Sequence, residues 1–282
     1  MTRVAIVTDS TAYLPRSLVE QYRLHVIPLY LMFGQEVLRD NVDITPDAFY
    51  QRLSMVKNGL PTTSQPSAGD FCELYKRVAQ ETDAIVSIHI SSLLSGTVAS
   101  ALQAKAMCPE VPIYVVDSLS TSMGLGYVVL AAARAREAGA GPEEMVAAAE
   151  AIIPKLQVYF VVDTLRYLHM GGRIGGASVL LGSALDIKPI LQLRGGRIEP
   201  AGKVRTMKRA IPYLVDMVVK QLGEGASTRA AVLHAAAPDD AQQLRQLLEQ
   251  RLNCVEMHSI EVSPVIGTHT GPGTVGAIAH LA

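Results

Sequence analysis

The stretch Ala84–Thr97, with the sequence AIVSIHISSLLSGT, decides the fold class of this 282-residue chain. It begins as an apolar run typical of a buried strand and continues as a hydroxyl-rich turn, which leads into helical spacing over 97–107. Two further apolar runs end in the same kind of turn, Val4–Val7 in Thr8–Thr11 and Ile113–Val116 in Asp117–Thr121. Strands and helices that alternate in this way predict an α/β domain with a mainly parallel sheet.

A second domain is predicted after a break in this pattern near Pro154–Gln157, where the β-rich run Val158–Val162 begins. The length is close to twice that of a typical domain, so we expect an N-terminal α/β domain over 1–156 and a C-terminal α/β or α+β domain over 157–282. In the second domain, Gly195–Gly196 joins two apolar segments and predicts a hairpin. Helical spacing predicts further helices at 66–81, 121–138, 143–153, 205–222 and 239–252, and we expect a short helix at the end of the chain.

The composition narrows the classes of partner. Apolar residues make up 49% of the chain and charged residues 18%, which supports a sizeable core. The formal net charge of -1 gives no field that would attract nucleic acid. Three separated cysteines predict reduced core thiols rather than a disulfide framework. No signal-peptide pattern precedes Val4–Val7 and no apolar run reaches the ~18 to 20 residues of a membrane span, so we expect a cytoplasmic protein without a transmembrane segment.

Two segments of the first domain are candidate anion-binding sites. Ser95, Gly96 and Thr97 stand at a predicted helix start, where unpaired N–H groups could receive a carboxylate or phosphate. The alternative is that these hydroxyls only cap the helix. The segment 61–67 presents a second polar cluster between two prolines, and Ser67 with Asp70 forms an imperfect capping box, because Glu or Gln is usual at the third position.

The second domain offers two basic candidates. His269 lies in the glycine-rich segment Gly267–Gly276, where an imidazole could hydrogen-bond an anion, although a structural role is an equal alternative. A dinucleotide site there is rejected, because the chain ends before the acidic residue expected about 20 positions onward. Arg173 is flanked by four glycines and could bind an oxyanion or form a surface salt bridge, and Lys203 and Arg205 are further basic groups.

Standard catalytic motifs are missing from the sequence, including the G-x-S-x-G elbow, the Walker A loop and H-E-x-x-H. Ser95 and His269 could still serve as nucleophile and base of an acyl-ester hydrolase, although no orienting carboxylate is identifiable. A hydrolase therefore stays open as an alternative.

Taken together, five separated motifs resemble the DegV family, whose bacterial members include the fatty-acid-binding FakB proteins. The resemblance spans essentially the whole chain and rests on Val7–Thr11, Thr63–Ser67, Ser91–Thr97, Gly171–Ile174 and Gly267–His269. It implies a two-domain fold with a buried acyl chain whose carboxylate lies near the domain junction.

The resemblance also implies roles for individual residues. Thr63, Ser95 and His269 match the positions that hold the carboxylate, and four neighbours could add contacts, namely Ser64, Gly96, Thr97 and Thr270. Members of the FakB type present the fatty acid to a separate ATP-dependent kinase, FakA, which makes acyl-phosphate for phospholipid synthesis. Arg173 and, with less support, Arg205 would receive the phosphate or the kinase.

The implied protein is thus a non-catalytic lipid carrier with no cofactor other than its bound long-chain fatty acid. A lipid-responsive regulatory protein is a third possibility beside the carrier and the hydrolase.

Overall fold

A computed structural model describes residues 3–56, 59–182 and 187–282 of the chain. It divides into two compact units. The first contains Met1–Asp43 and Thr63–Pro154, and the second contains Ile44–Thr62 and Lys155–Ala282. The domain prediction ends the first domain at 156 and assigns 44–62 to it, whereas in the structure 44–62 packs with the second unit.

The first unit is built on a parallel four-stranded sheet with the order β2-β1-β6-β7. Its strands are β1 (Val4–Asp9), β2 (Leu24–Ile27), β6 (Ala84–His89) and β7 (Ile113–Asp117). The chain order reverses between β1 and β6, which is the position where open α/β sheets usually place ligands at the carboxyl ends of their strands. The parallel sheet predicted from the strand–turn pattern is confirmed.

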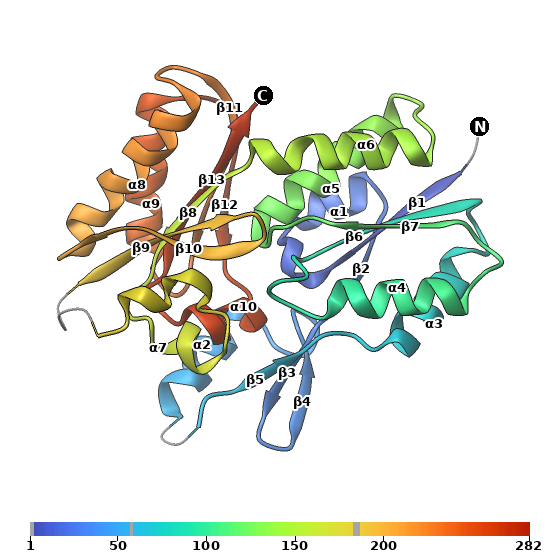
Figure 1. Cartoon of the computed structure of the whole chain (residues 1–282), viewed down its shortest axis with the longest axis horizontal. Helices are drawn as coiled ribbons and strands as arrows, with labels where there is room; N and C mark the ends of the chain where they lie inside the picture. Colours follow the sequence, from blue (N-terminus) through green and yellow to red (C-terminus); the bar gives the residue numbers. More distant parts are fainter. Residues whose placement is uncertain (1–2, 57–58, 183–186) are drawn as a thin grey trace. The chain divides into compact units, whose positions relative to one another are not determined.

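Helices cover both faces of this sheet (Figure 1). On one face lie α3 (Ala68–Val78) and α4 (Thr97–Met107), which bury apolar side chains against β1, β6 and β7. On the other face lie α5 (Ser122–Glu137) and α6 (Pro142–Ile152). The short helices η1 (Ser10–Ala12) and α1 (Arg16–Gln21) follow β1. Both faces of the strands are therefore buried, which explains why β1 and β6 read as continuous apolar runs.

A small separate sheet has the order β4-β3-β5. Its strands are β3 (Tyr30–Phe33), β4 (Glu36–Arg39) and β5 (Thr62–Ser64), and β3 pairs with β4 as an antiparallel hairpin. This sheet carries Thr63 on β5.

The second unit contains a mixed six-stranded sheet with the order β10-β9-β8-β13-β11-β12. Its strands are β8 (Gln157–Val161), β9 (Lys188–Arg194), β10 (Arg197–Val204), β11 (Ser227–His234), β12 (Asn253–Glu261) and β13 (Val275–Leu281). The helices α8 (Met207–Leu222) and α9 (Pro238–Arg251) bury their apolar faces against this sheet (Figure 1). The predicted hairpin is confirmed, since Arg194 pairs with Arg197 across Gly195–Gly196.

The remaining elements of the second unit are α2 (Pro46–Met55), α7 (Arg166–Met170), η3 (Gly175–Leu180) and α10 (Pro264–Thr270). The short helix η2 (Ile153–Lys155) contains the point of the sequence, after Pro154, at which the first unit ends. The expected short helix at the end of the chain is wrong. Gly267–Thr270 belongs to α10, and the chain then turns and ends in β13, which lies between β8 and β11. Its residues from Val275 to His280 are buried, so apolar residues follow one another without the alternation that marks a half-exposed strand.

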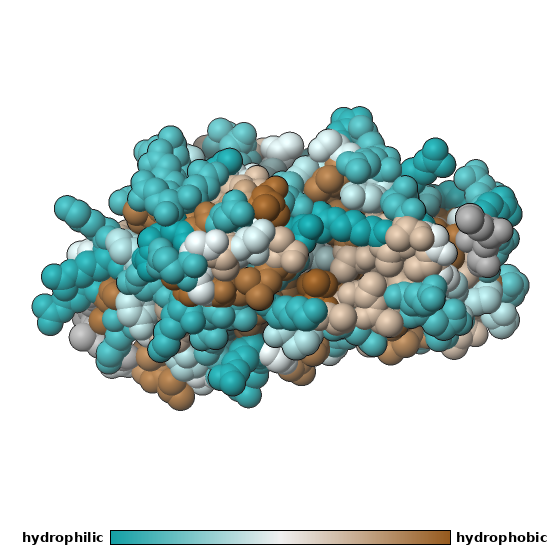
Figure 2. All heavy atoms as spheres, turned by 90° about the horizontal axis from the view of Figure 1, so that it is seen from above, coloured by the Kyte–Doolittle hydropathy of each residue, from teal (hydrophilic) through white to brown (hydrophobic). Residues whose placement is uncertain are grey.

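The surface is mixed rather than dominated by one apolar patch on the face drawn in Figure 2, where hydrophilic side chains surround small apolar groups. Within the described ranges, no helix combines the length and the apolar character needed to cross a bilayer.

Candidate functional site

The hydroxyl-rich segment Ser91–Thr97 leaves the carboxyl end of β6 and opens α4. Backbone bonds from Leu94 and Ser95 to the carbonyl oxygen of Ser91, both 3.0 Å, fold it into a tight turn. The N-cap of α4 is Gly96, which makes no side-chain cap, so the interpretation of these hydroxyls as helix caps is wrong. The Ser95 hydroxyl is instead 2.8 Å from the Thr97 hydroxyl, and Ser95 is half-buried.

The polar segment 63–67 lies beside this turn. The side-chain amide nitrogen Nε2 of Gln65 is 3.0 Å from the point where a Cβ on Gly96 would stand. The structure therefore brings two of the candidate segments of the first unit together, although about 30 residues separate them in sequence. Ser67 does cap α3: its hydroxyl accepts from the Asp70 N–H at 3.1 Å, and the Asp70 carboxylate accepts from the Ser67 N–H at 2.8 Å. Asp thus replaces Glu or Gln in a complete capping box.

His269 occupies the last turn of α10 in the second unit. Two glycines let neighbouring aromatic residues pack closely on this short helix. A Cβ on Gly267 would stand 2.5 Å from the Tyr50 hydroxyl, and one on Gly271 would overlap the Tyr167 ring. The Tyr50 hydroxyl also donates to the carbonyl oxygen of Val262 at 3.0 Å. Tyr50 of α2 and Tyr167 of α7 therefore pack against α10 within two residues of His269.

The Gly-Gly-Arg motif packs directly against this imidazole. A Cβ on Gly171 would overlap the ring nitrogen Nδ1 of His269 and would stand 3.1 Å from Cε1. The guanidinium of Arg173 donates from Nη1 to the Gly171 carbonyl oxygen at 2.7 Å. Burial, and then the positive charge of Arg173, lowers the pKa of His269 to about 4. The imidazole is therefore neutral at pH 7, with one ring nitrogen as a donor and the other as an acceptor.

The three predicted carboxylate contacts are divided between the units: Thr63 and Ser95 belong to the first and His269 to the second. Thr63 is half-buried on β5. Of the predicted additional contacts, the Ser64 hydroxyl donates to the Gln65 carbonyl at 3.2 Å and the Thr270 hydroxyl to the Ile266 carbonyl at 3.2 Å.

The two predicted phosphate or kinase contacts lie on different segments of the second unit. Arg173 follows α7 and is half-buried. Arg205 is exposed on the stretch between β10 and α8. Arg173 is thus the one that the structure ties to His269.

No sequence pattern predicted a buried polar network that joins β1, β6 and α3. His89 lies 3.1 Å from an Asp9 carboxylate oxygen through Nδ1 and 2.7 Å from the Ser87 hydroxyl through Nε2. This is a serine–histidine–aspartate series, but all three residues are 0% exposed and the Ser87 hydroxyl also bonds Tyr75 at 2.8 Å. A substrate cannot reach Ser87, so the network holds the carboxyl ends of β1 and β6 rather than acting as a nucleophile.

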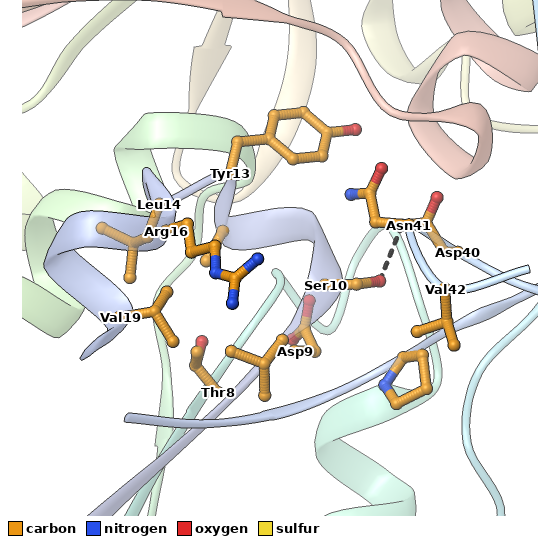
Figure 3. Close-up of a pocket in the computed structure, with 13 residues that line it drawn as sticks. Thr8, Asp9, Ser10, Tyr13, Leu14, Arg16, Val19, Asp40, Asn41 and Val42 are labelled. Carbon is orange, nitrogen blue, oxygen red and sulfur yellow. Dashed lines mark hydrogen bonds between the residues drawn. The ribbon is translucent and has the colours of Figure 1, made fainter. Parts of the chain in front are cut away.

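The turn after β1 also borders a cavity of about 400 Å³ within the first unit. Figure 3 shows the thirteen lining residues, with the Arg16 guanidinium directed over the space between Thr8 and Ser10. The Ser10 hydroxyl donates to Asp40 at 2.7 Å, and Asp9 accepts from the Thr11 N–H at 3.0 Å. Most of the cavity wall is apolar, and the two carboxylates at its edge already accept hydrogen bonds.

In the described part of the chain, no three His, Cys, Asp or Glu side chains are grouped so that they could hold a metal ion. The polar groups around Ser95 and around His269 are hydroxyls, an amide, a neutral imidazole and a guanidinium. Such groups are suited to hydrogen-bond an anion.

Known proteins match this chain in sequence and in structure over almost its whole length. A DegV domain-containing protein of Streptomyces coelicolor is 46% identical over 277 residues, covering 98% of this chain and 97% of that protein. A solved structure of a DegV family protein from Thermus thermophilus, described by its fatty acid binding, superposes with a TM-score of 0.94 at 38% identity and covers 99% of this chain and 100% of its own.

A second solved structure, DegV of Bacillus subtilis, is described as a fatty acid binding protein. It superposes with a TM-score of 0.91 at 35% identity, and all of both chains is covered. The family model described as an uncharacterised protein of the DegV family matches residues 3–281. The chain therefore belongs to the DegV family.

Proposed function

We propose that this protein binds one long-chain fatty acid and holds its carboxylate with Thr63, Ser95 and His269. The observation that carries the proposal is the setting of His269, a neutral imidazole on α10 that packs against Gly171 at the end of α7, with the charge of Arg173 beside it. The Thermus thermophilus and Bacillus subtilis relatives, both described by fatty acid binding, support the choice of ligand.

The chemistry of these groups suits a carboxylate. A carboxylate taken out of water must receive hydrogen bonds or lose its charge. The hydroxyls of Thr63 and Ser95 and one N–H of a neutral His269 can each donate, and each such bond to a charged group contributes about 1.5 to 3 kcal/mol. Ser64, Gly96, Thr97 and Thr270 are neighbours of the three and supply further polar contacts in this proposal.

Burial of the acyl chain would supply most of the binding free energy. Burial of a methylene is worth about 0.8 kcal/mol, so about 14 methylenes contribute roughly 11 kcal/mol against an association cost of about 4 to 15 kcal/mol. Three hydrogen bonds to the carboxylate then decide whether binding is tight and which end of the ligand is held. A methyl ester of the same chain would lose the charge-assisted bonds and bind more weakly.

The physiological role that we propose is presentation of the bound acid to a separate, FakA-like ATP-dependent kinase, which forms acyl-phosphate for phospholipid synthesis. Arg173 supports this role, because a half-buried guanidinium beside His269 adds positive charge where phosphate would be transferred. Arg205 is exposed and would contribute to docking of the kinase. The carrier itself would perform no bond-breaking step.

The site is tested by isothermal titration of the delipidated protein with palmitate. Thr63→Val, Ser95→Ala and His269→Asn should each weaken binding roughly 10- to 150-fold, the equivalent of one charge-assisted hydrogen bond. Ser67→Ala is the matched control, because its hydroxyl caps α3 and is not a ligand contact in the proposal. Wild-type affinity in Ser95→Ala and His269→Asn would refute the site assignment.

The carrier and hydrolase functions are separated by a covalent serine probe and by a kinase assay. A carrier should leave the probe unreacted and should yield acyl-phosphate only when the kinase and ATP are added. Labelling of Ser95, or release of acid from an acyl ester without kinase, would favour hydrolysis instead.

A further inference from the structure

Two of the three cysteines meet in the core of the first unit. Cys72 lies on α3, and Cys108 is the C-cap residue of α4. Their sulfur atoms are 2.9 Å apart, although 36 positions separate the residues in sequence. The cysteines are 6% and 0% exposed, respectively, and both belong to the apolar cluster between these helices and the sheet. Both are free thiols in this structure.

We propose that Cys72 and Cys108 are a modification site at which a low-molecular-weight disulfide oxidises the pair to an intramolecular disulfide that joins α3 to α4. The site is separate from every residue proposed to contact the fatty acid, so this inference does not rest on the proposed function. Cys254 lies in the second unit and takes no part.

The geometry supports the cross-link. A disulfide bond is about 2.05 Å long and requires neighbouring Cβ atoms that point toward each other. The sulfur atoms already lie 2.9 Å apart, so closing the remaining gap needs a shift of less than an ångström shared by two residues. Packing of α3 on α4 keeps the pair together in the folded chain and not in the unfolded one.

The reaction is a balanced thiol–disulfide exchange. One cysteine thiolate attacks the oxidant, forms a mixed disulfide and expels one small thiolate. The second cysteine attacks the protein sulfur of that mixed disulfide and expels the other small thiolate. The cysteine pair gives up two electrons, the oxidant is reduced to two thiols, and these take up the two protons.

Burial of the two thiols affects the rate of their oxidation and not the position of the equilibrium between dithiol and disulfide. Burial raises the pKa of Cys108 to about 11, with further contributions from Cys72 and Glu110 and an opposing one from Lys76. Thiolate is the attacking species, so oxidation of the folded protein near neutral pH is slow. The position of equilibrium, which is independent of access, is therefore the quantity to measure.

The test uses the full chain with Cys254→Ser, which leaves Cys72 and Cys108 as the two thiols. Reduced protein unfolded in urea is divided, and one half is refolded into a glutathione redox buffer while the other is equilibrated with the same buffer in urea. After acid quenching and alkylation, intact mass gives the ratio of disulfide to dithiol, and peptide mapping locates the cross-link. We expect the ratio to be at least roughly 30-fold higher in the refolded protein.

The matched control is Cys72→Ser, which also retains two thiols and should show no enrichment on refolding. Circular dichroism checks that each variant refolds, and Cys254→Ala replaces Cys254→Ser if the latter does not. An equal or lower ratio in the refolded protein, a predominance of glutathione mixed disulfides, or the same enrichment in Cys72→Ser would overturn the proposal.

Discussion

Gly171→Ala tests the contact that ties the Gly-Gly-Arg motif to the candidate site. The new methyl group would overlap Nδ1 of His269 and would stand 3.0 Å from the Tyr167 carbonyl oxygen. The carbonyl belongs to α7 and the imidazole is a side chain, so the imidazole is the group that moves. We expect displacement of His269 and loss of its hydrogen bond to the ligand, which weakens palmitate binding roughly 10- to 150-fold.

Stability must be separated from affinity in this test. Overpacking at Gly171 should lower the free energy of unfolding by about 1 to 3 kcal/mol. Gly172→Ala is the matched control: Gly172 has a φ of +71°, so alanine costs about 1 to 2 kcal/mol, but no atom lies within 4 Å of its added methyl group. Both variants should lose stability, and only Gly171→Ala should lose affinity.

The assay is isothermal titration of the delipidated variants, completed by a double-mutant cycle with His269→Asn. If Gly171→Ala acts through the imidazole, the double variant should bind no more than about twofold more weakly than His269→Asn alone. Affinity of Gly171→Ala within about twofold of wild type would refute the reasoning. It would also be refuted if the losses of binding free energy in the two single variants added up in the double variant.

Three further expectations concern charge and burial. Below pH 6.5 His269 becomes protonated in the unfolded chain, whereas in the folded chain it stays neutral down to its pKa of about 4. The free energy of unfolding should therefore fall by up to about 3 kcal/mol from pH 6.5 to 4. Urea unfolding of His269→Asn should show a smaller decrease over this pH range, and an equal decrease in wild type and variant would contradict the prediction. Arg173→Gln removes a positive charge and should raise the pKa of His269, followed by histidine NMR titration; no upward shift would be evidence against the proximity. Asp9→Asn leaves His89 and the Ile90 N–H facing an amide in place of a carboxylate and should lower the free energy of unfolding by about 1 to 3 kcal/mol in urea unfolding. Asp83→Asn, at an exposed ion pair, should hardly change the urea midpoint.

Local patterns in the sequence predicted several helices and strands close to their observed positions. The helix expected at 97–107 is α4, and the glycine pair at 195–196 joins β9 to β10. The final strand was expected as a helix, because a short buried apolar run has no periodicity that separates the two. Segment 44–62 groups with the second unit, where Tyr50 of α2 packs against Gly267 of α10, and no local pattern in the sequence reveals this contact.

The sequence predicted candidate site residues where several polar or glycine residues follow one another in a short segment. Ser95 and His269 lie in hydroxyl-rich or glycine-rich segments that are visible in the sequence. Residues that meet only after folding were missed, because Asp9 and His89 lie 80 positions apart and the paired cysteines 36. Such contacts are a property of the sheet order and of helix packing, which a single sequence does not specify.

Native mass spectrometry of the purified protein, followed by denaturation and identification of any released molecule, tests the central claim most directly. We expect one long-chain fatty acid per chain, released on denaturation without any covalent adduct, and reloading of the stripped protein by C16 or C18 acids. A protein that is purified empty and does not take up either acid would contradict the account.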